Sequence, residues 1–204
     1  MATKFLLIRH GAHLLGADTI AGRSPGVNLS PLGERQVAEM IDRVAHLPIR
    51  AVYSSPVDRT MQTARPLAAR LGLEVQVRET LSEVDYGDWT RKRLEEVRPL
   101  DRWKQWNAFR SGHRIPGGES MVDIQSRIVG EMQRLREQHA DGDCVALVSH
   151  GDVIKAATAW FLGVPIDLFT RIEIGLASVT AIAIGDYGPW VLCVNNTSRI
   201  ELPA

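Results

Sequence analysis

FLLIRHGAH (residues 5–13) decides the fold, because it changes from apolar to charged and polar residues in the middle. Four apolar residues, typical of a short buried strand, run directly into Arg9, His10 and Gly11. A cation and an imidazole at the end of a core strand cost free energy unless something binds there. The stretch therefore predicts a strand whose carboxyl end reaches a functional site.

Two later apolar runs end in a similar way. AVY at 51–53 is followed by SSP at 54–56, and CVALV at 144–148 is followed by SHG at 149–151. Helix-like stretches separate the three runs, an alternation typical of a parallel sheet with helices on both faces. We therefore expect an α/β fold of three layers, α/β/α, in which a mostly parallel central sheet has an antiparallel edge.

Cap and turn signals set the limits of the expected elements. A serine followed by a proline predicts helices that begin at Pro31 and Pro56, and Gly72 ends the second of them. Ser120, with Asp123 three residues later, forms a capping box for a helix to about residue 139. The other expected elements are a strand at 74–78, a helix at 152–162, and a hairpin that pairs 178–184 with 190–195.

Residues 85–118 interrupt this alternation of expected strands and helices. They are rich in charge and tryptophan and contain two prolines, which predicts an insertion of short helices over one edge of the sheet and over the site. The chain has 204 residues, of which 45% are hydrophobic, enough to bury one proper core. We expect a single domain over residues 1–204, with 85–118 as a helical cap.

Composition narrows the classes of partner. The 24 basic and 24 acidic residues cancel, so no overall field attracts nucleic acid or an anionic membrane. Cys144 and Cys193 lie in apolar runs and make no zinc-binding spacing. Neither a long apolar run nor a signal-peptide pattern occurs near the start. We expect a cytoplasmic protein that binds neither nucleic acid nor membrane.

The polar ends of the three strands are expected to share one rim of the sheet. Ligands of an open parallel sheet bind outside the carboxyl ends of the strands, so Arg9, His10 and His150 converge there. The second helix begins at this rim, where its free N–H groups favour an anion, and Arg59 projects back toward the helix start. The result is a cationic pocket of a size to hold a phosphoryl group.

Six ordered blocks of the chain resemble one known family. The resemblance is to the histidine phosphatase superfamily, the phosphoglycerate-mutase-like proteins, and within it to the compact phosphatases. It runs in order from residue 5 to about 156. The blocks are RHG at 9–11, GR at 22–23, SSPxxRxxQTA at 54–64, LxExDYGxW at 81–89, GGES at 117–120 and SHGDVIKA at 149–156.

This resemblance implies that His10 is a nucleophile that becomes a phosphohistidine. The chemistry of the neighbours agrees, because nearby cations lower the pKa of an imidazole and keep it neutral. A well-placed arginine also stabilises the transferring phosphoryl group, by about 10³ to 10⁵ in rate. By resemblance the catalytic residues are His10, Arg9, Arg59, His150 and Glu83, and the substrate contacts are Arg9, Gly11, Arg23, Arg59, His150 and Gly151.

Glu83 is, by the same resemblance, the general acid that protonates the leaving alkoxide and later the base toward water. It needs a raised pKa for that role, which burial under the insertion would supply.

The chain departs from the family pattern at two positions after RHG. A Ser or Thr, and three residues further on often an Asn, usually contact phosphate there, whereas this chain has His13 and Gly16. His13 retains an N–H donor or, when protonated, a positive charge. The departure bears on substrate identity and catalytic strength more than on reaction type.

A metal site is an alternative interpretation of the histidines. His10 and His13, with the distant His150, form a set that zinc can use. Arg9 and Arg59, however, would repel a dication in the same pocket. We therefore expect neither a metal nor another cofactor.

Three functions fit this pattern. The leading hypothesis is a metal-independent phosphomonoester phosphatase that acts on a small phosphorylated metabolite. A phosphoglycerate mutase and a non-catalytic phosphate-binding module are the alternatives. The chain length suits the compact phosphatases, and the tail hairpin offers an edge for a homodimer.

Overall fold

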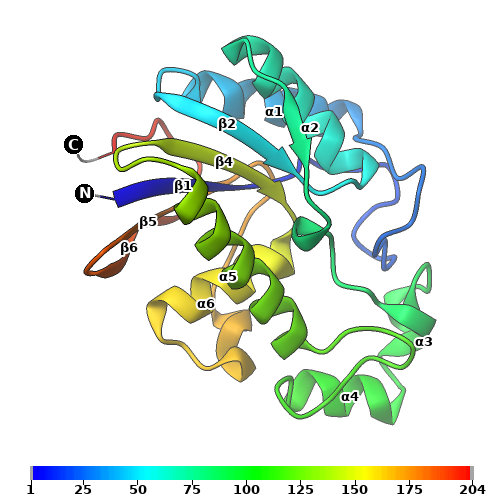
Figure 1. Ribbon diagram of the computed structural model, residues 1–204. Coiled ribbons are helices and arrows are strands. Elements are labelled where there is room, and N and C mark those ends of the chain that lie inside the picture. The colour runs from blue at the N-terminus through cyan, green and yellow to red at the C-terminus, as the bar shows by residue number, and fades with distance from the viewer. Residues whose placement is uncertain (1, 203–204) are drawn as a thin grey trace.

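A six-stranded sheet runs through the centre of the computed structural model, which describes residues 2–202 (Figure 1). The strand order is β3-β2-β4-β1-β5-β6. Neighbours among the first four strands are parallel, and β5 is antiparallel to both β1 and β6, which confirms the predicted sheet. The strands are β1 (Ala2–Arg9), β2 (Ile49–Ser54), β3 (Val75–Val77), β4 (Cys144–Ser149), β5 (Val179–Gly185) and β6 (Gly188–Asn196).

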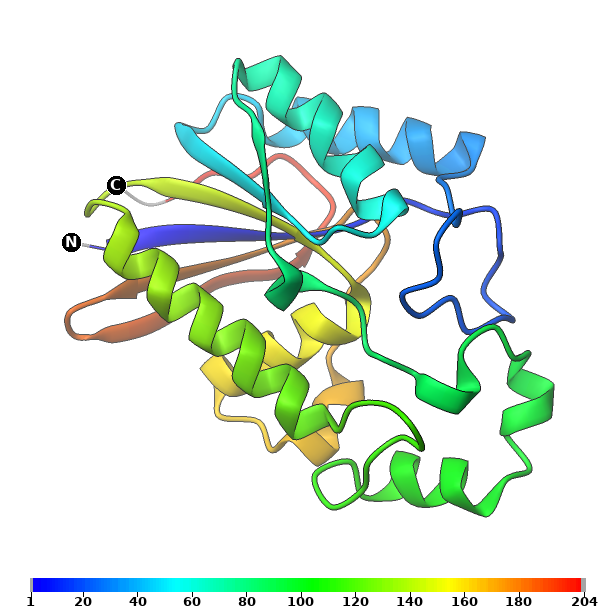
Figure 2. The ribbon, with the colours of Figure 1, turned by 45° about the vertical axis from the view of Figure 1, so that its right-hand side comes forward.

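Helices cover both faces of the sheet, which confirms the three predicted layers (Figures 1 and 2). In β1, Leu6 and Ile8 face one core, while Phe5 and Leu7 face the other. FLLI is apolar throughout because both faces of this strand are covered. The first core lies under α1 (Pro31–Val44) and α2 (Asp58–Leu71), and the second under α5 (Met121–Gln138) and α6 (Gly151–Leu162).

The structure confirms the predicted caps at three helix ends. Oγ of Ser30 accepts a hydrogen bond from the backbone N–H of Gly33 at the start of α1. Ser120 and Asp123 form the capping box of α5. Gly72 ends α2 with a φ of 68°, in the left-handed region that favours glycine.

The predicted start of α2 was wrong by two residues. The helix begins at Asp58 rather than at Pro56. Ser55 precedes a proline, which favours extended backbone at this position. Its hydroxyl accepts a hydrogen bond from the N–H of Val57 and also contacts a ring nitrogen of His150. Ser55 therefore belongs to the site at the rim and does not cap the helix.

Residues 85–118 form short helices beyond the carboxyl ends of the strands (Figure 2). These are α3 (Leu94–Val97), α4 (Asp101–Ala108) and the 3-10 helix η2 (Gly87–Trp89). Trp89, Trp103 and Trp106 pack together with ring centroids 5.1 to 5.7 Å apart. The two ends of the segment come together at Gly87, where the backbones approach so closely that a Cβ would lie 2.2 Å from the carbonyl oxygen of Pro116.

The C-terminal hairpin of β5 and β6 confirms the predicted pairing and extends it by several residues. Two further 3-10 helices, η1 (Glu79–Leu81) and η3 (Ile166–Arg171), connect the larger elements. None of the helices between residues 2 and 202 combines the length and the apolar character that crossing a bilayer requires. The predicted domain limits, residues 1 and 204, lie outside the described residues.

Candidate active site

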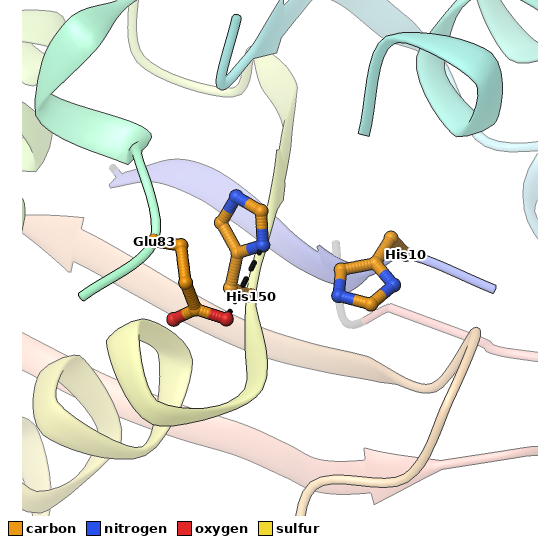
Figure 3. Close-up of side chains that lie close together, drawn as sticks. All are labelled: His10, Glu83 and His150. Carbon is orange, nitrogen blue, oxygen red and sulfur yellow. Dashed lines mark ion pairs between the residues drawn. The ribbon is translucent and has the colours of Figure 1, made fainter. Parts of the chain in front are cut away.

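The ends of β1 and β4 place two histidines side by side. Arg9 is the register partner of Ser149 in this parallel pair, so His10 and His150 follow at the same level. Their ring centroids are 5.2 Å apart. Figure 3 shows Glu83 beside His150, with His10 across from them; the three side chains come from three separate segments.

His10 is a neutral imidazole with one defined tautomer. Its Nδ1 lies 2.7 Å from the carbonyl oxygen of Gly11, which only accepts, so Nδ1 carries the proton. Nε of Arg59, which only donates, bonds to Nε2 of His10 at 3.1 Å. Burial, and next the charge of Arg59, hold the pKa of His10 well below its usual value. The unprotonated Nε2 is therefore the nucleophilic atom of this side chain.

Arg59 joins the other groups of the site. Its side chain is 1% exposed, and Nη2 donates to the carbonyl oxygen of Gly22 at 2.9 Å and to Nδ1 of His150 at 3.1 Å. The same nitrogen lies 3.4 Å from Oε2 of Glu83. Nη1 is buried and has no hydrogen-bond partner among the described residues, 2–202. Arg59 thus holds the histidines and the carboxyl group together and keeps one donor for a ligand.

His150 is also a neutral donor and acceptor. Because its Nδ1 accepts from Arg59, its Nε2 carries the proton and donates to Oγ of Ser55 at 2.9 Å. Burial, and next the charge of Arg59, hold the pKa of His150 well below its usual value. The ring is fully buried and fixed from both sides.

Glu83 follows η1 and turns its carboxyl group toward His150, with Oε2 3.5 Å from Nδ1 (Figure 3). Its side chain is 14% exposed. Burial raises the pKa of Glu83, the charge of Arg59 opposes this, and the charge of Asp152 raises it further. Glu83 therefore keeps its proton to higher pH than an ordinary glutamate, as a general acid requires.

The loop that carries Glu83 is held by two arginines that share one carboxylate. Arg23 and Arg127 both donate to the backbone carbonyl of Glu83, at 2.8 and 3.2 Å. Both also pair with Glu119, at 2.8 and 3.1 Å. Arg23 was expected to contact substrate, but it does not line the cavity beside His10, because Glu119 and the Glu83 loop hold its guanidinium. Arg127 was not anticipated, since it belongs to no motif.

Gly11 and Gly151 make room for their neighbours. A Cβ at Gly11 would lie 2.6 Å from the carbonyl oxygen of Gly33, and a Cβ at Gly151 would lie 3.1 Å from the guanidinium of Arg9. Arg9 donates from Nη1 to the carbonyl oxygen of Ile174, and its buried Nε has no partner in the protein. Neither glycine is among the residues that line the cavity, and neither is His150; the substrate contacts of these three residues stay predictions.

A cavity of about 250 Å³ opens beside His10. Arg9, His10, Arg59 and Glu83 form its polar end. His13, which departs from the family pattern, also lines it; its ring centroid lies 5.7 Å from that of His10, and its buried Nδ1 has no partner. The rest of the lining comprises Gly16, Ala17, Thr19, Ile20, Ala21, Gly22, Tyr86, Leu94 and Trp103.

A metal ion would meet a guanidinium in this site. One ligand atom each from His10, Glu83 and His150 lies within 4.8 Å of the others, a spacing that a metal can use. Arg59, however, is within hydrogen-bonding distance of all three side chains. Its positive charge already occupies the place of a cation. The donor set therefore suits an anion better than a metal.

The comparisons with known proteins agree with this geometry. A family model described as the histidine phosphatase superfamily (branch 1) matches residues 5–197. The chain belongs to the histidine phosphatase superfamily. This membership confirms the predicted resemblance and, with it, the predicted enzyme class, a phosphoric monoester hydrolase.

Individual proteins match over almost the whole chain. Phosphoserine phosphatase 1 of Hydrogenobacter thermophilus is 28% identical, covering 97% of this chain and 94% of its own. A Yersinia enterocolitica protein named "Probable phosphoglycerate mutase GpmB" is 30% identical, covering 97% and 95%. The solved structure of Bacillus stearothermophilus YhfR has a TM-score of 0.89 at 26% identity, covering 98% and 100%.

Proposed function

We propose that this histidine phosphatase hydrolyses phosphate monoesters of small metabolites without a metal ion, through a phosphohistidine on His10. One observation carries the proposal. Around the unprotonated Nε2 of His10, the guanidinium nitrogens Nε of Arg9 and Nη1 of Arg59 are buried without partners in the protein. Buried N–H groups without partners are costly, and the oxygens of a phosphoryl group would satisfy them.

In the first step, Nε2 of His10 attacks phosphorus and the bond from phosphorus to the ester oxygen breaks. The leaving oxygen takes the proton of Glu83, so the alcohol departs neutral. The attack leaves positive charge on the ring, which the hydrogen bond from Nδ1 to the Gly11 carbonyl disperses. Arg9 and Arg59 stabilise the charge on the transferring oxygens.

In the second step, water attacks phosphorus and the bond to Nε2 breaks. Glu83, now ionised, accepts a proton from that water, which returns both His10 and Glu83 to their starting states. Inorganic phosphate is the product. We further propose that residues 85–118 act as a cap on one catalytic domain, because they lie over the cavity that contains these groups.

Release of phosphate from an aryl phosphate in the presence of EDTA tests the proposal. We expect turnover that resists the chelator and is abolished in His10→Ala, together with a quenched wild-type intermediate that is heavier by one phosphoryl group. Activity that survives His10→Ala, or that EDTA removes, would contradict the mechanism. No turnover of any ester would instead favour the phosphate-binding module.

The mutase alternative is tested with 3-phosphoglycerate as substrate. A phosphatase forms free phosphate, whereas a mutase forms 2-phosphoglycerate. Dominant isomerisation would overturn the proposed hydrolysis while leaving His10 as the nucleophile. The homodimer stays a prediction, which sedimentation of the purified chain would check.

A further inference from the structure

The far wall of the cavity carries several apolar side chains and no cation, and we infer that the enzyme selects esters whose leaving group is neutral and apolar over esters that carry a carboxylate. The inference rests on the proposed hydrolysis. Beyond the phosphoryl end, the wall is formed by the apolar side chains of Ala17, Ile20, Ala21, Leu94 and Trp103, together with the hydroxyl-bearing side chains of Thr19 and Tyr86. A carboxylate on the leaving group would lose water against these side chains and gain no ion pair.

The arginines near the cavity are engaged elsewhere. Arg23 pairs with Glu119, Arg93 pairs with Glu95 at 3.0 Å, and Arg91 donates to the carbonyl oxygen of Pro25 at 3.0 Å. Arg110 stacks on Trp106, with its guanidinium carbon 3.8 Å from the ring centroid, and donates from Nη2 to Oδ1 of Asn107. Its Nε and Nη1 are buried without partners among residues 2–202. None of these four lines the cavity beside His10.

Lys92 belongs to a different groove. Its backbone carbonyl accepts from Ile20, but the residue lines a depression with Asp88 and Leu100 and not the cavity beside His10. The cations of the cavity, Arg9 and Arg59, thus lie at its phosphoryl end. A substrate with one phosphoryl group uses both of them and leaves none for a second anion.

The other polar groups of the wall also disfavour a carboxylate. Burial, and next the charges of Arg59 and Arg9, lower the pKa of His13, so this ring is neutral at neutral pH. The hydroxyl of Tyr86 donates to Oδ2 of Asp152 at 3.1 Å, which brings a negative charge behind the wall. Neither His13 nor Tyr86 therefore offers a positive charge to a second anion.

Trp103 gives the wall a rigid aromatic surface. It is half-buried, and its ring packs at 5.1 Å from that of Trp89 and at 5.6 Å from that of Trp106. A planar leaving group can stack on a ring that its neighbours hold in place. The volume of about 250 Å³ limits such a group to a small one.

Three aryl phosphates of one shape test the inference: phenyl phosphate, 4-carbamoylphenyl phosphate and 4-carboxyphenyl phosphate. The last two differ in charge and hardly in size, so their kcat/KM ratio isolates the effect of the carboxylate. We expect the carbamoyl ester to exceed the carboxy ester at least about tenfold. Equal values, or a preference for the carboxy ester, would overturn the inference.

Two variants at the rim sharpen this test. Ala17 is exposed and lines the cavity, so Ala17→Arg adds a cation to the wall, and Ala17→Gln adds a neutral side chain of similar reach. The arginine variant should bring the ratio of carbamoyl to carboxy ester toward one, and the glutamine variant should not. A ratio that both variants change equally would show that charge does not set the preference.

Substitution of Trp103 tests the aromatic surface. Trp103→Ala should lower kcat/KM for phenyl phosphate roughly two- to tenfold, and Trp103→Phe should retain most of it. Equal losses in both variants, with unchanged melting temperatures, would contradict stacking. If none of the three esters is hydrolysed, the proposed function fails; if the carboxy ester is preferred and Lys92→Ala removes that preference, only the present inference fails.

Discussion

Nε of Arg59 donates a hydrogen bond to Nε2 of His10 across 3.1 Å, so the cation of α2 touches the proposed nucleophilic atom itself. The bond marks where a phosphoryl group would have to enter, with its phosphorus toward Nε2. It also keeps the imidazole from taking a proton, because an adjacent guanidinium opposes a second positive charge.

Replacement of Arg59 should therefore alter both rate and titration. Arg59→Lys keeps the charge and loses the planar fork, while Arg59→Met removes the charge. We expect both to lose about 10³ or more in kcat. The pKa of His10, measured by NMR, should move up toward its usual value in Arg59→Met and less in Arg59→Lys. Circular dichroism checks that both variants fold, and equal titration in the two would contradict the electrostatic role.

In the pH profile of kcat/KM, the acid limb should lie below the usual pKa of a histidine and the basic limb above the usual pKa of a carboxyl group. The rate needs neutral His10, whose lowered pKa puts the acid limb below the usual histidine range. It also needs protonated Glu83, whose raised pKa puts the basic limb above the usual carboxyl range. The measurement is a pH series in wild type and Glu83→Gln, in which the basic limb should vanish. A basic limb that persists unchanged would assign it to another group.

Glu83→Gln should also be sensitive to the leaving group. A nitrophenolate leaves without a proton, whereas an alkoxide needs one, so loss of the acid should harm alkyl esters far more. We expect kcat/KM to fall about 10² to 10⁴ for an alkyl phosphate and much less for 4-nitrophenyl phosphate. The ratio kcat/KM is the right measure, because it reports the first phosphoryl transfer and not the later attack of water. Equal losses for both esters would argue against Glu83 as the acid.

Glu119 should act as a positioning residue. It accepts from the N–H of Asp85 at 3.0 Å and pairs with the two arginines that hold the Glu83 loop. We expect Glu119→Gln to lower kcat/KM about 10- to 100-fold and to move the basic limb of the pH profile, since Glu83 loses its fixed place. Glu137→Gln, an exposed glutamate of α5, is the matched control. A lower melting temperature without any change of the pH profile would indicate a purely structural role.

Two glycines in helices should respond to alanine with opposite sign. A Cβ at Gly33 would lie 2.0 Å from the backbone oxygen of Ala12, whereas a Cβ at Gly130 meets nothing within 4 Å. We expect Gly33→Ala to lower the free energy of unfolding by about 1 to 3 kcal/mol. Gly130→Ala should raise it by about 0.4 to 1 kcal/mol. Urea denaturation measures both, and stabilisation by Gly33→Ala would contradict the close contact with the loop after β1.

The sheet and its rim could be predicted because they depend on local patterns. FLLI and CVALV read as strands, and the carboxyl ends of parallel strands meet at one edge, so the meeting of His10 and His150 followed from topology. The start of α2 was missed because Ser55 carries a capping side chain that the structure uses for His150 instead. Capping rules do not show when a nearby ring competes for the same hydroxyl.

The support of Glu83 could not be predicted. Arg127 and Glu119 lie eight positions apart at the start of α5, but no spacing along the chain shows that Arg127 also reaches the backbone carbonyl of Glu83, forty-four positions earlier. Arg23 lies within a matching block, GR at 22–23, yet its direction depends on Glu119, ninety-six positions later. The apolar side chains of the cavity wall could not be predicted either, because Ile20 and Trp103 come together only in the folded chain.

Neighbouring strands of any sheet run about 4.8 Å apart, and the two imidazoles that extend β1 and β4 stand 5.2 Å apart. Backbone pairing of β1 and β4 thus sets the spacing of the two chain positions, and Arg59 and Ser55 then fix the rings. Loops that shape the mouth of the cavity can then lengthen, shorten or change composition while the distance between the rings stays constant.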